Sequence, residues 1–242
     1  MTNLKGRFPT VGCPLRLEFC LKGVVPRLSA SVEGFRIALT AWQILVERAK
    51  IRAGQKVFIQ AGSGGVGTIA IQLAKHLGAK VATTTSTANV NWVKSLGADV
   101  VVDYKQADFE EVLNGYDVVL NSQDSTTLGK SFKVLKSGGQ VISISGPPDA
   151  EFAEAQKLAW PFKQLMRLLS FSARRKAKSR NASYSFLFMK ASGDQLRQIA
   201  ALIESGAIRP IVDKVFPFAS TNEAVAYVES GRAKGKVVIK VR

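Results

Sequence analysis

The residues best suited to chemistry are three glycines, Gly62, Gly64 and Gly67, in a Gly-x-Gly-x-x-Gly spacing. A β-rich apolar run at 57–59 precedes them, and an amphipathic helical pattern that stops at Gly78 follows. Gly62 would allow the tight turn, Gly64 the approach of a pyrophosphate, and Gly67 close packing of the helix on the strand. The helix N-terminus would offer N–H groups to the phosphates. Strand, glycine turn and helix in this order predict a dinucleotide-binding unit rather than a purely structural turn.

The elements that must position this turn alternate between strand and helix. After the first unit we expect strands at 80–84, 100–103, 118–121, 141–145 and 186–189, with helices at 90–96, 109–113, 128–135 and 196–203. A helix is also expected at 37–51, and a strand, a short helix and a last strand at 211–215, 224–228 and 237–241. Repeated βα units predict an α/β fold with a doubly wound parallel sheet of the Rossmann type.

Ligands of such sheets lie beyond the carboxyl ends of the strands, which selects the loop residues there. An NAD site needs an acidic residue about 20 positions after the glycines, to hold the ribose 2′-hydroxyl. No acidic residue occurs between Thr68 and Ala98, and hydroxyls at 84–87 follow the second strand instead. We therefore predict NADP. For Tyr104 a contact to the 2′-phosphate and ordinary packing remain equally open, as do ribose binding and a turn-capping role for Asn121.

Other chemistry finds little support in the composition. The chain has one histidine, His76, and two cysteines, Cys13 and Cys20, too few for the usual catalytic zinc ligand sets. No nucleophile–base constellation or paired carboxylates stand out, so no catalytic residue and no metal ligand is assigned. The cysteine count gives no disulfide framework, and no signal peptide or apolar run of about 18 residues is present. We expect a cytoplasmic protein without stable membrane insertion.

The net charge of +16 raises the question of an anionic partner. Basic residues are dispersed except for a cluster at 174–180, so we expect no nucleic-acid binding. An apolar helical stripe at 158–169 leads into this cluster. A membrane-surface helix and a helix packed over the sheet both fit that pattern, and the packed helix is favoured.

Several stretches, in order, resemble one family: LTAWQ at 39–43, GQKVFIQAGSGGVG at 54–67, KSLGADVVVDY at 94–104, YDVVLNS at 116–122, LKSGGQVISISG at 135–146 and GRAKGKVVIKV at 231–241. The chain is similar to medium-chain dehydrogenases/reductases of the zinc-independent quinone oxidoreductase branch. This resemblance implies an NADPH-dependent enzyme that transfers hydride to a small electrophilic substrate, namely a quinone, an enone or a related carbonyl compound.

The resemblance also implies roles for individual residues. Gly62 and the cradle Ser63, Gly64, Gly65, Val66 and Gly67 would hold the pyrophosphate, and Ser86 and Tyr104 would meet the 2′-phosphate. Asn121 and Ser145 would lie near the nicotinamide half, and Lys236 would return to the cofactor cleft. Asn89 stands where some members carry a lysine for the 2′-phosphate.

The front of the chain departs from the family, whose members begin with a GroES-like barrel that forms the other wall of the active site. Residues 1–38, with a strand expected at 15–20, do not align with that barrel. We expect an irregular segment at 1–38, the Rossmann-like domain at 39–209, and a segment at 210–242 that returns to the catalytic domain. A missing wall would leave NADPH binding intact, slow the reduction of quinones or enones, and favour homo-oligomers. The alternative function is a nucleotide-binding or interaction module whose basic surface meets anionic membrane or nucleic acid.

Overall fold

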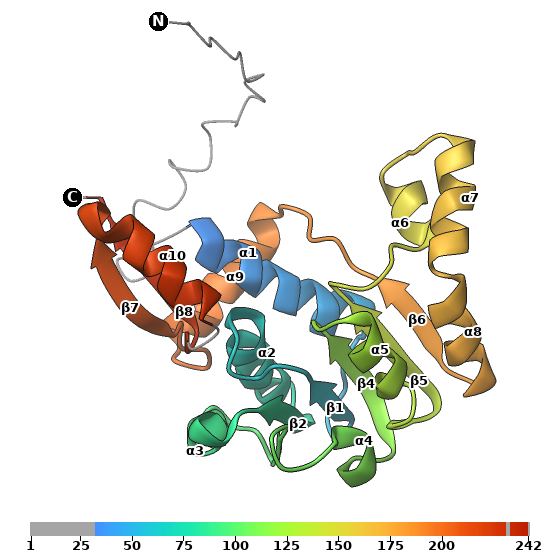
Figure 1. Ribbon diagram of the computed structural model, residues 1–242, viewed down its shortest axis with the longest axis horizontal. Helices are drawn as coiled ribbons and strands as arrows, with labels where there is room; N and C mark the ends of the chain where they lie inside the picture. Colours follow the sequence, from blue (N-terminus) through green and yellow to red (C-terminus); the bar gives the residue numbers. More distant parts are fainter. Residues whose placement is uncertain (1–31, 231–232, 242) are drawn as a thin grey trace, which may run out of the picture.

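The computed structural model describes residues 32–230 and 233–241. Six parallel strands form one sheet in the order β3-β2-β1-β4-β5-β6, and a doubly wound parallel sheet is the fold predicted from the sequence (Figure 1). The strands are β1 Lys56–Ile59, β2 Lys80–Thr85, β3 Val100–Asp103, β4 Tyr116–Asn121, β5 Leu135–Ser143 and β6 Ser183–Phe186. The α/β fold is thereby confirmed. The chain reverses direction across the sheet between β1 and β4, the switch point at which such folds bind ligands.

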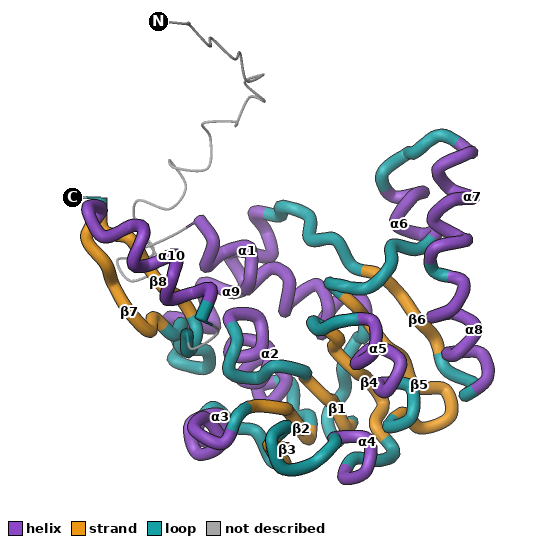
Figure 2. The backbone as a smooth tube through the Cα atoms, in the orientation of Figure 1, coloured by secondary structure: helices purple, strands orange, loops and turns teal. Residues whose placement is uncertain are grey.

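Helices cover both faces of this sheet (Figure 2). One layer contains α1 Val32–Trp42, α2 Gly65–His76, α3 Val90–Ser95 and α9 Gly193–Glu204, and the other contains α4 Phe109–Val112, α5 Ser125–Ser131 and α8 Phe171–Ser179. Helix α1 continues into a π-helical segment, η1, at Gln43–Arg48. Helices α6 Ala150–Ala155 and α7 Trp160–Leu169 lie between β5 and α8. Short 3-10 segments lie at Thr87–Asn89 and Phe218–Ser220.

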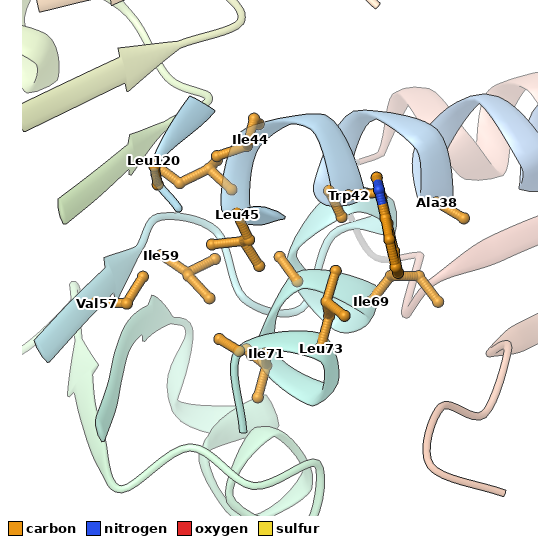
Figure 3. Packing of buried hydrophobic residues seen from close by; sticks show 14 of the residues in the cluster. Ala38, Trp42, Ile44, Leu45, Val57, Ile59, Ile69, Ile71, Leu73 and Leu120 are labelled. Carbon is orange, nitrogen blue, oxygen red and sulfur yellow. The ribbon is translucent and has the colours of Figure 1, made fainter. Parts of the chain in front are cut away.

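Successive side chains of β1 point to opposite faces of the sheet and belong to two hydrophobic cores. Val57 and Ile59 join the cluster beneath α1, α2 and α9, where Leu45, Ile71 and Leu73 also pack (Figure 3). Phe58 points to the opposite cluster and stacks on Phe109 and Tyr116, with ring centroids 4.9 and 6.1 Å apart. All three strand residues are fully buried, as expected for a central parallel strand with helices on both sides.

A second, two-stranded parallel sheet pairs β7 Val212–Pro217 with β8 Lys236–Lys240, and α10 Thr221–Glu229 connects them. Figure 1 places this unit at the opposite end of the molecule from α6 and α7. The expected strands at 211–215 and 237–241 therefore pair with each other. The backbone N–H of Gly235 donates to the carbonyl of Ser63, so the C-terminal segment does reach the glycine turn.

Several element boundaries differ from the sequence prediction. The first helix begins at Val32, inside the segment predicted to be irregular, and the strand predicted at 15–20 lies outside the described residues. β5 begins at Leu135, where a helix was predicted to end, because Leu135 already pairs with Tyr116 of β4, and the pairing resumes at Gln140 after an irregularity in register. β6 lies at 183–186 instead of 186–189, since Ser183 to Phe186 pair with Gln140 to Ser143. Apolar runs alone did not show which residues the neighbouring strand selects.

Candidate functional site: the glycine turn and the carboxyl edge of the sheet

The three glycines of the turn prove to be required for different reasons. A β-carbon at Gly62 would lie 2.1 Å from Oγ1 of Thr83, and one at Gly67 would lie 2.3 Å from the carbonyl oxygen of Ala61. Both positions are therefore closed to any side chain. The left-handed residue of this turn is Ala61, with φ 51°, and the φ of Gly62 is not positive. Gly62 is needed because Thr83 fills the space beside it, whereas Gly67 provides the predicted close approach of α2.

Of the three glycines, Gly64 leaves the most room for a side chain. It is the N-cap of α2 with extended backbone (φ −78°, ψ 170°), and a β-carbon there would meet only the Ala61 carbonyl, at 3.2 Å. The first N–H groups of α2, from Gly65 through Val66 to Gly67, have no partner within the helix, and no acidic residue occupies its first turn. An open cradle of N–H groups at a positive helix end fits an anionic pyrophosphate.

Lys236 lies beside this cradle, as the sequence predicted. Cε and Nζ of Lys236 would lie 3.3 and 3.6 Å from a β-carbon at Gly65. The lysine reaches this position from β8, because Gly235 is bonded to Ser63 and Lys236 N–H donates to the carbonyl of Ile211. A cation is thus brought to the turn by residues far away in the chain.

The ends of β2 and β3 form the neighbouring part of the edge. Gly62 N–H donates to the Thr84 carbonyl, and Tyr104 N–H donates to the Thr85 carbonyl, so Ser86 and Tyr104 follow adjacent strand ends. Tyr104 is 61% exposed, which rules out packing in the core as its role. The Asn89 amide donates to Ser86 Oγ at 3.3 Å.

Three polar atoms at this edge are buried without a hydrogen-bond partner among the described residues: Oγ1 of Thr85, Oδ1 of Asn89 and Oδ2 of Asp103. The first two flank Ser86. Buried polar groups are nearly always paired, so orphaned ones beside a strand end point to a ligand that completes them. A ribose or phosphate oxygen would accept a hydrogen bond from the Thr85 hydroxyl. The residues present therefore fit the adenosine half of a nicotinamide cofactor.

Sequence reasoning missed Asp103, which ends β3 directly opposite Thr85. The Thr87 hydroxyl, together with the backbone N–H of Lys105, holds the pKa of this carboxyl below its ordinary value, so it is charged at neutral pH. The stretch without acidic residues that favours NADP ends at Ala98, before β3. The signal for Asp103 is its position at the end of the neighbouring strand, because parallel pairing brings both strand ends to the same edge.

Asn121 and Ser145, predicted near the nicotinamide half, differ in their surroundings. The Asn121 side chain is fully buried: its amide N–H donates to Gln60 Oε1 at 2.7 Å, and its Oδ1 accepts from Ser143 Oγ at 2.6 Å. Asn121 thus lies in the interior beneath the edge, and its predicted place near the nicotinamide half stays a prediction. Ser145 is exposed, and its hydroxyl donates to the Gln123 carbonyl at 2.6 Å.

The buried amides tie the ends of the central strands together. Gln60, after β1, donates to Ser131 Oγ of α5 at 2.7 Å, and Ser143 Oγ accepts from Gly146 N–H at 2.7 Å. With Asn121 these side chains connect β1, β4 and β5 at the switch point. A satisfied buried network of this kind rigidifies the core and favours one packing of these strand ends.

Zinc ligands are not gathered within 32–230 and 233–241: no group of three or more His, Cys, Asp and Glu side chains there could hold a metal. His76 is exposed at the end of α2, the polar helix-end position predicted for it. Within the same residues no helix is long and apolar enough to cross a membrane.

A doubly wound sheet with an open glycine turn at its switch point defines a Rossmann-type dinucleotide-binding module. Residues 96–239 match the zinc-binding dehydrogenase family, and the chain belongs to this family. The predicted membership of the medium-chain dehydrogenases/reductases is confirmed, and with it an oxidoreductase lineage.

Individual relatives agree with this assignment. The chain is 31% identical over 217 residues to the chloroplastic NADPH-dependent alkenal/one oxidoreductase of Arabidopsis thaliana, covering 87% of this chain and 47% of the relative. It is 33% identical over 207 residues to 2-methylene-furan-3-one reductase of Solanum lycopersicum, covering 83% and 44%. The quinone oxidoreductase of Coxiella burnetii superposes with a TM-score of 0.71 at 27% identity, covering 85% and 58%. The chain thus spans about half the length of these proteins.

Proposed function

We propose that the chain binds NADPH along the carboxyl edge of its sheet and serves the reduction of a conjugated carbonyl compound or quinone. The proposal rests on the environment of Gly64 at the N-terminus of α2: a β-carbon added there would contact no other side chain. When bound, the nicotinamide supplies the hydride. The residues of this chain bind and orient it: N–H groups at Gly65 to Gly67 and the Lys236 ammonium face the pyrophosphate, while Ser86, Thr85 and Tyr104 face the adenosine ribose.

The proposed substrate class rests on the relatives. Their names specify an alkenal/one, a 2-methylene-furan-3-one and a quinone. These compounds share a carbon–carbon double bond conjugated with a carbonyl, which accepts hydride at carbon. No described residue is assigned as a proton donor, and the chain's part is to hold the cofactor and line one wall of the cleft.

The proposed preference for the phosphorylated cofactor rests on hydroxyls at the end of β2, which donate to a 2′-phosphate without repelling it. Asp103 opposes that preference, because its carboxylate lies at the same edge. We expect Asp103→Asn to raise the NADPH-to-NADH affinity ratio and Ser86→Ala to lower it, each by about 3- to 10-fold, the effect of roughly one hydrogen bond or one screened charge.

Calorimetric titration of NADPH and NADH into the purified chain tests the proposal. Gly64→Val should keep the fold and weaken NADPH binding at least about tenfold, or 1.4 kcal/mol, because a branched side chain blocks the backbone donors. Gly193→Val is the matched control: this glycine begins α9, and a β-carbon there meets nothing within 4 Å. Unchanged NADPH affinity in a folded Gly64→Val protein would remove the pyrophosphate from this turn.

Activity is followed as oxidation of NADPH with an enone and a quinone as acceptors. Acceptor-dependent oxidation that Gly64→Val abolishes and Gly193→Val retains is the expected pattern. Oxidation that survives Gly64→Val at the wild-type rate would contradict the assignment of hydride transfer to this site.

A further inference from the structure

Helix α7 exposes the side of an amphipathic helix that normally faces a core. None of its residues is buried, and Phe162, Leu165, Leu168 and Leu169 are 45–72% exposed. Their spacing of three and four residues places them on one side of the helix, with Lys163 and Arg167 on the other. The favoured sequence prediction, a helix packed over the sheet, is therefore wrong. Figure 1 shows α7 standing at the edge of the molecule beyond β6.

The neighbouring helix α8 presents a basic side next to this apolar one. Phe171, Arg175 and Lys178 follow one another at helical spacing, opposite the buried Ala173 and Ala177. Ser170 joins the two helices (φ −84°, ψ 0°). At about 100° per residue, Phe171, Arg175 and Lys178 follow Arg167 along the chain, so the basic side of α8 adjoins the apolar side of α7 and does not continue it. We call the exposed side chains at 162, 165, 168, 169, 171, 175 and 178 the α7–α8 surface.

The charge around this surface has one sign. No acidic residue occurs between Glu154 and Asp194, whereas lysines and arginines stand at 157, 163, 167, 174, 175, 176, 178, 180 and 190. The ion pairs among the described residues that involve α6 and α9, Arg48–Glu151 and Arg197–Asp194, lie outside this segment. The α7–α8 surface thus combines large aliphatic side chains with uncompensated positive charge.

We propose that the α7–α8 surface docks the protein on an anionic lipid bilayer. Leucine and phenylalanine side chains would enter the boundary between headgroups and acyl chains, while Arg175 and Lys178 would meet lipid phosphates. A second copy of the chain would bring two basic segments together. A nucleic acid would leave the leucines exposed, since aliphatic side chains do not stack on bases as aromatic ones do. Only an anionic bilayer satisfies both halves of the surface. The docking surface is separate from the glycine turn and independent of cofactor binding.

Flotation of the protein with lipid vesicles tests this proposal. Wild-type protein should float with vesicles of phosphatidylcholine and phosphatidylglycerol, remain behind with phosphatidylcholine alone, and dissociate as salt is raised. The Leu165→Gln/Leu168→Gln and Arg175→Gln/Lys178→Gln pairs should each lower the bound fraction at least about fivefold, because each removes one half of the two-part attraction.

Matched control pairs change side chains of the same kinds elsewhere. Val225→Gln/Val228→Gln alters two exposed apolar residues of α10, and Lys80→Gln/Lys94→Gln removes two exposed charges near the other end of the sheet. Both controls should stay within about twofold of wild type, and all four variants should keep the wild-type melting temperature, since the changed side chains are exposed. Equal melting temperatures separate loss of docking from loss of fold.

The proposal would be overturned by no flotation with anionic vesicles, by equal flotation with neutral ones, or by equal losses in the control pairs. A lipid-free dimer, seen by light scattering and dissolved by Leu165→Gln/Leu168→Gln, would assign the surface to a second copy instead. Binding to a DNA duplex that outcompetes the anionic vesicles would also reject the bilayer.

Discussion

Replacing Asn121 by leucine tests whether the buried amide network stabilises the fold. Leucine is close to asparagine in size, but it removes the donor to Gln60 Oε1 and the acceptor of the Ser143 hydroxyl, both bonds of 2.6–2.7 Å. Asn121, Gln60 and Ser143 are each 0–1% exposed, so water cannot replace the lost partners.

The expected loss of unfolding free energy follows from the two buried groups that lose their partner, Gln60 Oε1 and the Ser143 hydroxyl. A buried group left without its partner costs about 1–3 kcal/mol, and apolar contacts of the leucine recover part of the sum. We expect Asn121→Leu to lower the free energy of unfolding by about 2–5 kcal/mol, or the melting temperature by roughly 5–15 °C for a domain of this size.

Urea denaturation followed by circular dichroism measures this loss, with Asn91→Leu at an exposed position of α3 as the matched control. NADPH affinity of the folded variant should change by less than about threefold, since the replaced side chain has no exposed surface for a ligand. A stability loss below about 1 kcal/mol together with a large loss of NADPH affinity would refute the network and restore Asn121 as a cofactor contact.

Two further predictions concern packing and pH. Gly67→Ala should destabilise the fold by about 1–3 kcal/mol, because the new β-carbon would meet the Ala61 backbone. Gly193→Ala, the control, should be neutral or stabilising by up to about 1 kcal/mol. Equal melting temperatures of these two variants would contradict the prediction. For Asp117, burial alone would raise the pKa, but the Lys136 ammonium and the Lys56 N–H outweigh it and lower the pKa. Ionised Asp117 therefore makes its full contribution to the free energy of unfolding above the ordinary carboxyl pKa. This contribution is lost as the pH falls through the lower pKa of the folded state. The difference in unfolding free energy between wild type and Asp117→Asn should be largest near neutral pH and shrink below about pH 4; a difference that grows on acidification would be the contrary result.

The sequence by itself determined the doubly wound order of units and the glycine turn. Val57 to Ile59, Gly64 and the helix after it are contiguous, and local periodicity and chain stiffness govern such elements. The quoted family stretches also placed Lys236 at the cofactor cleft, and the structure brings it beside Gly65. These features depend on the types and the order of neighbouring residues, and both can be read from the sequence.

Tertiary structure decided what depends on neighbours distant in the chain. Strand pairing set the bounds of β5 and β6, brought Asp103 opposite Thr85, and enclosed Asn121 among Gln60 and Ser143. It also left the apolar side of α7 uncovered, although its periodicity is the same as that of a buried helix. Periodicity shows that a helix has an apolar side, but only the positions of the other elements determine what that side meets.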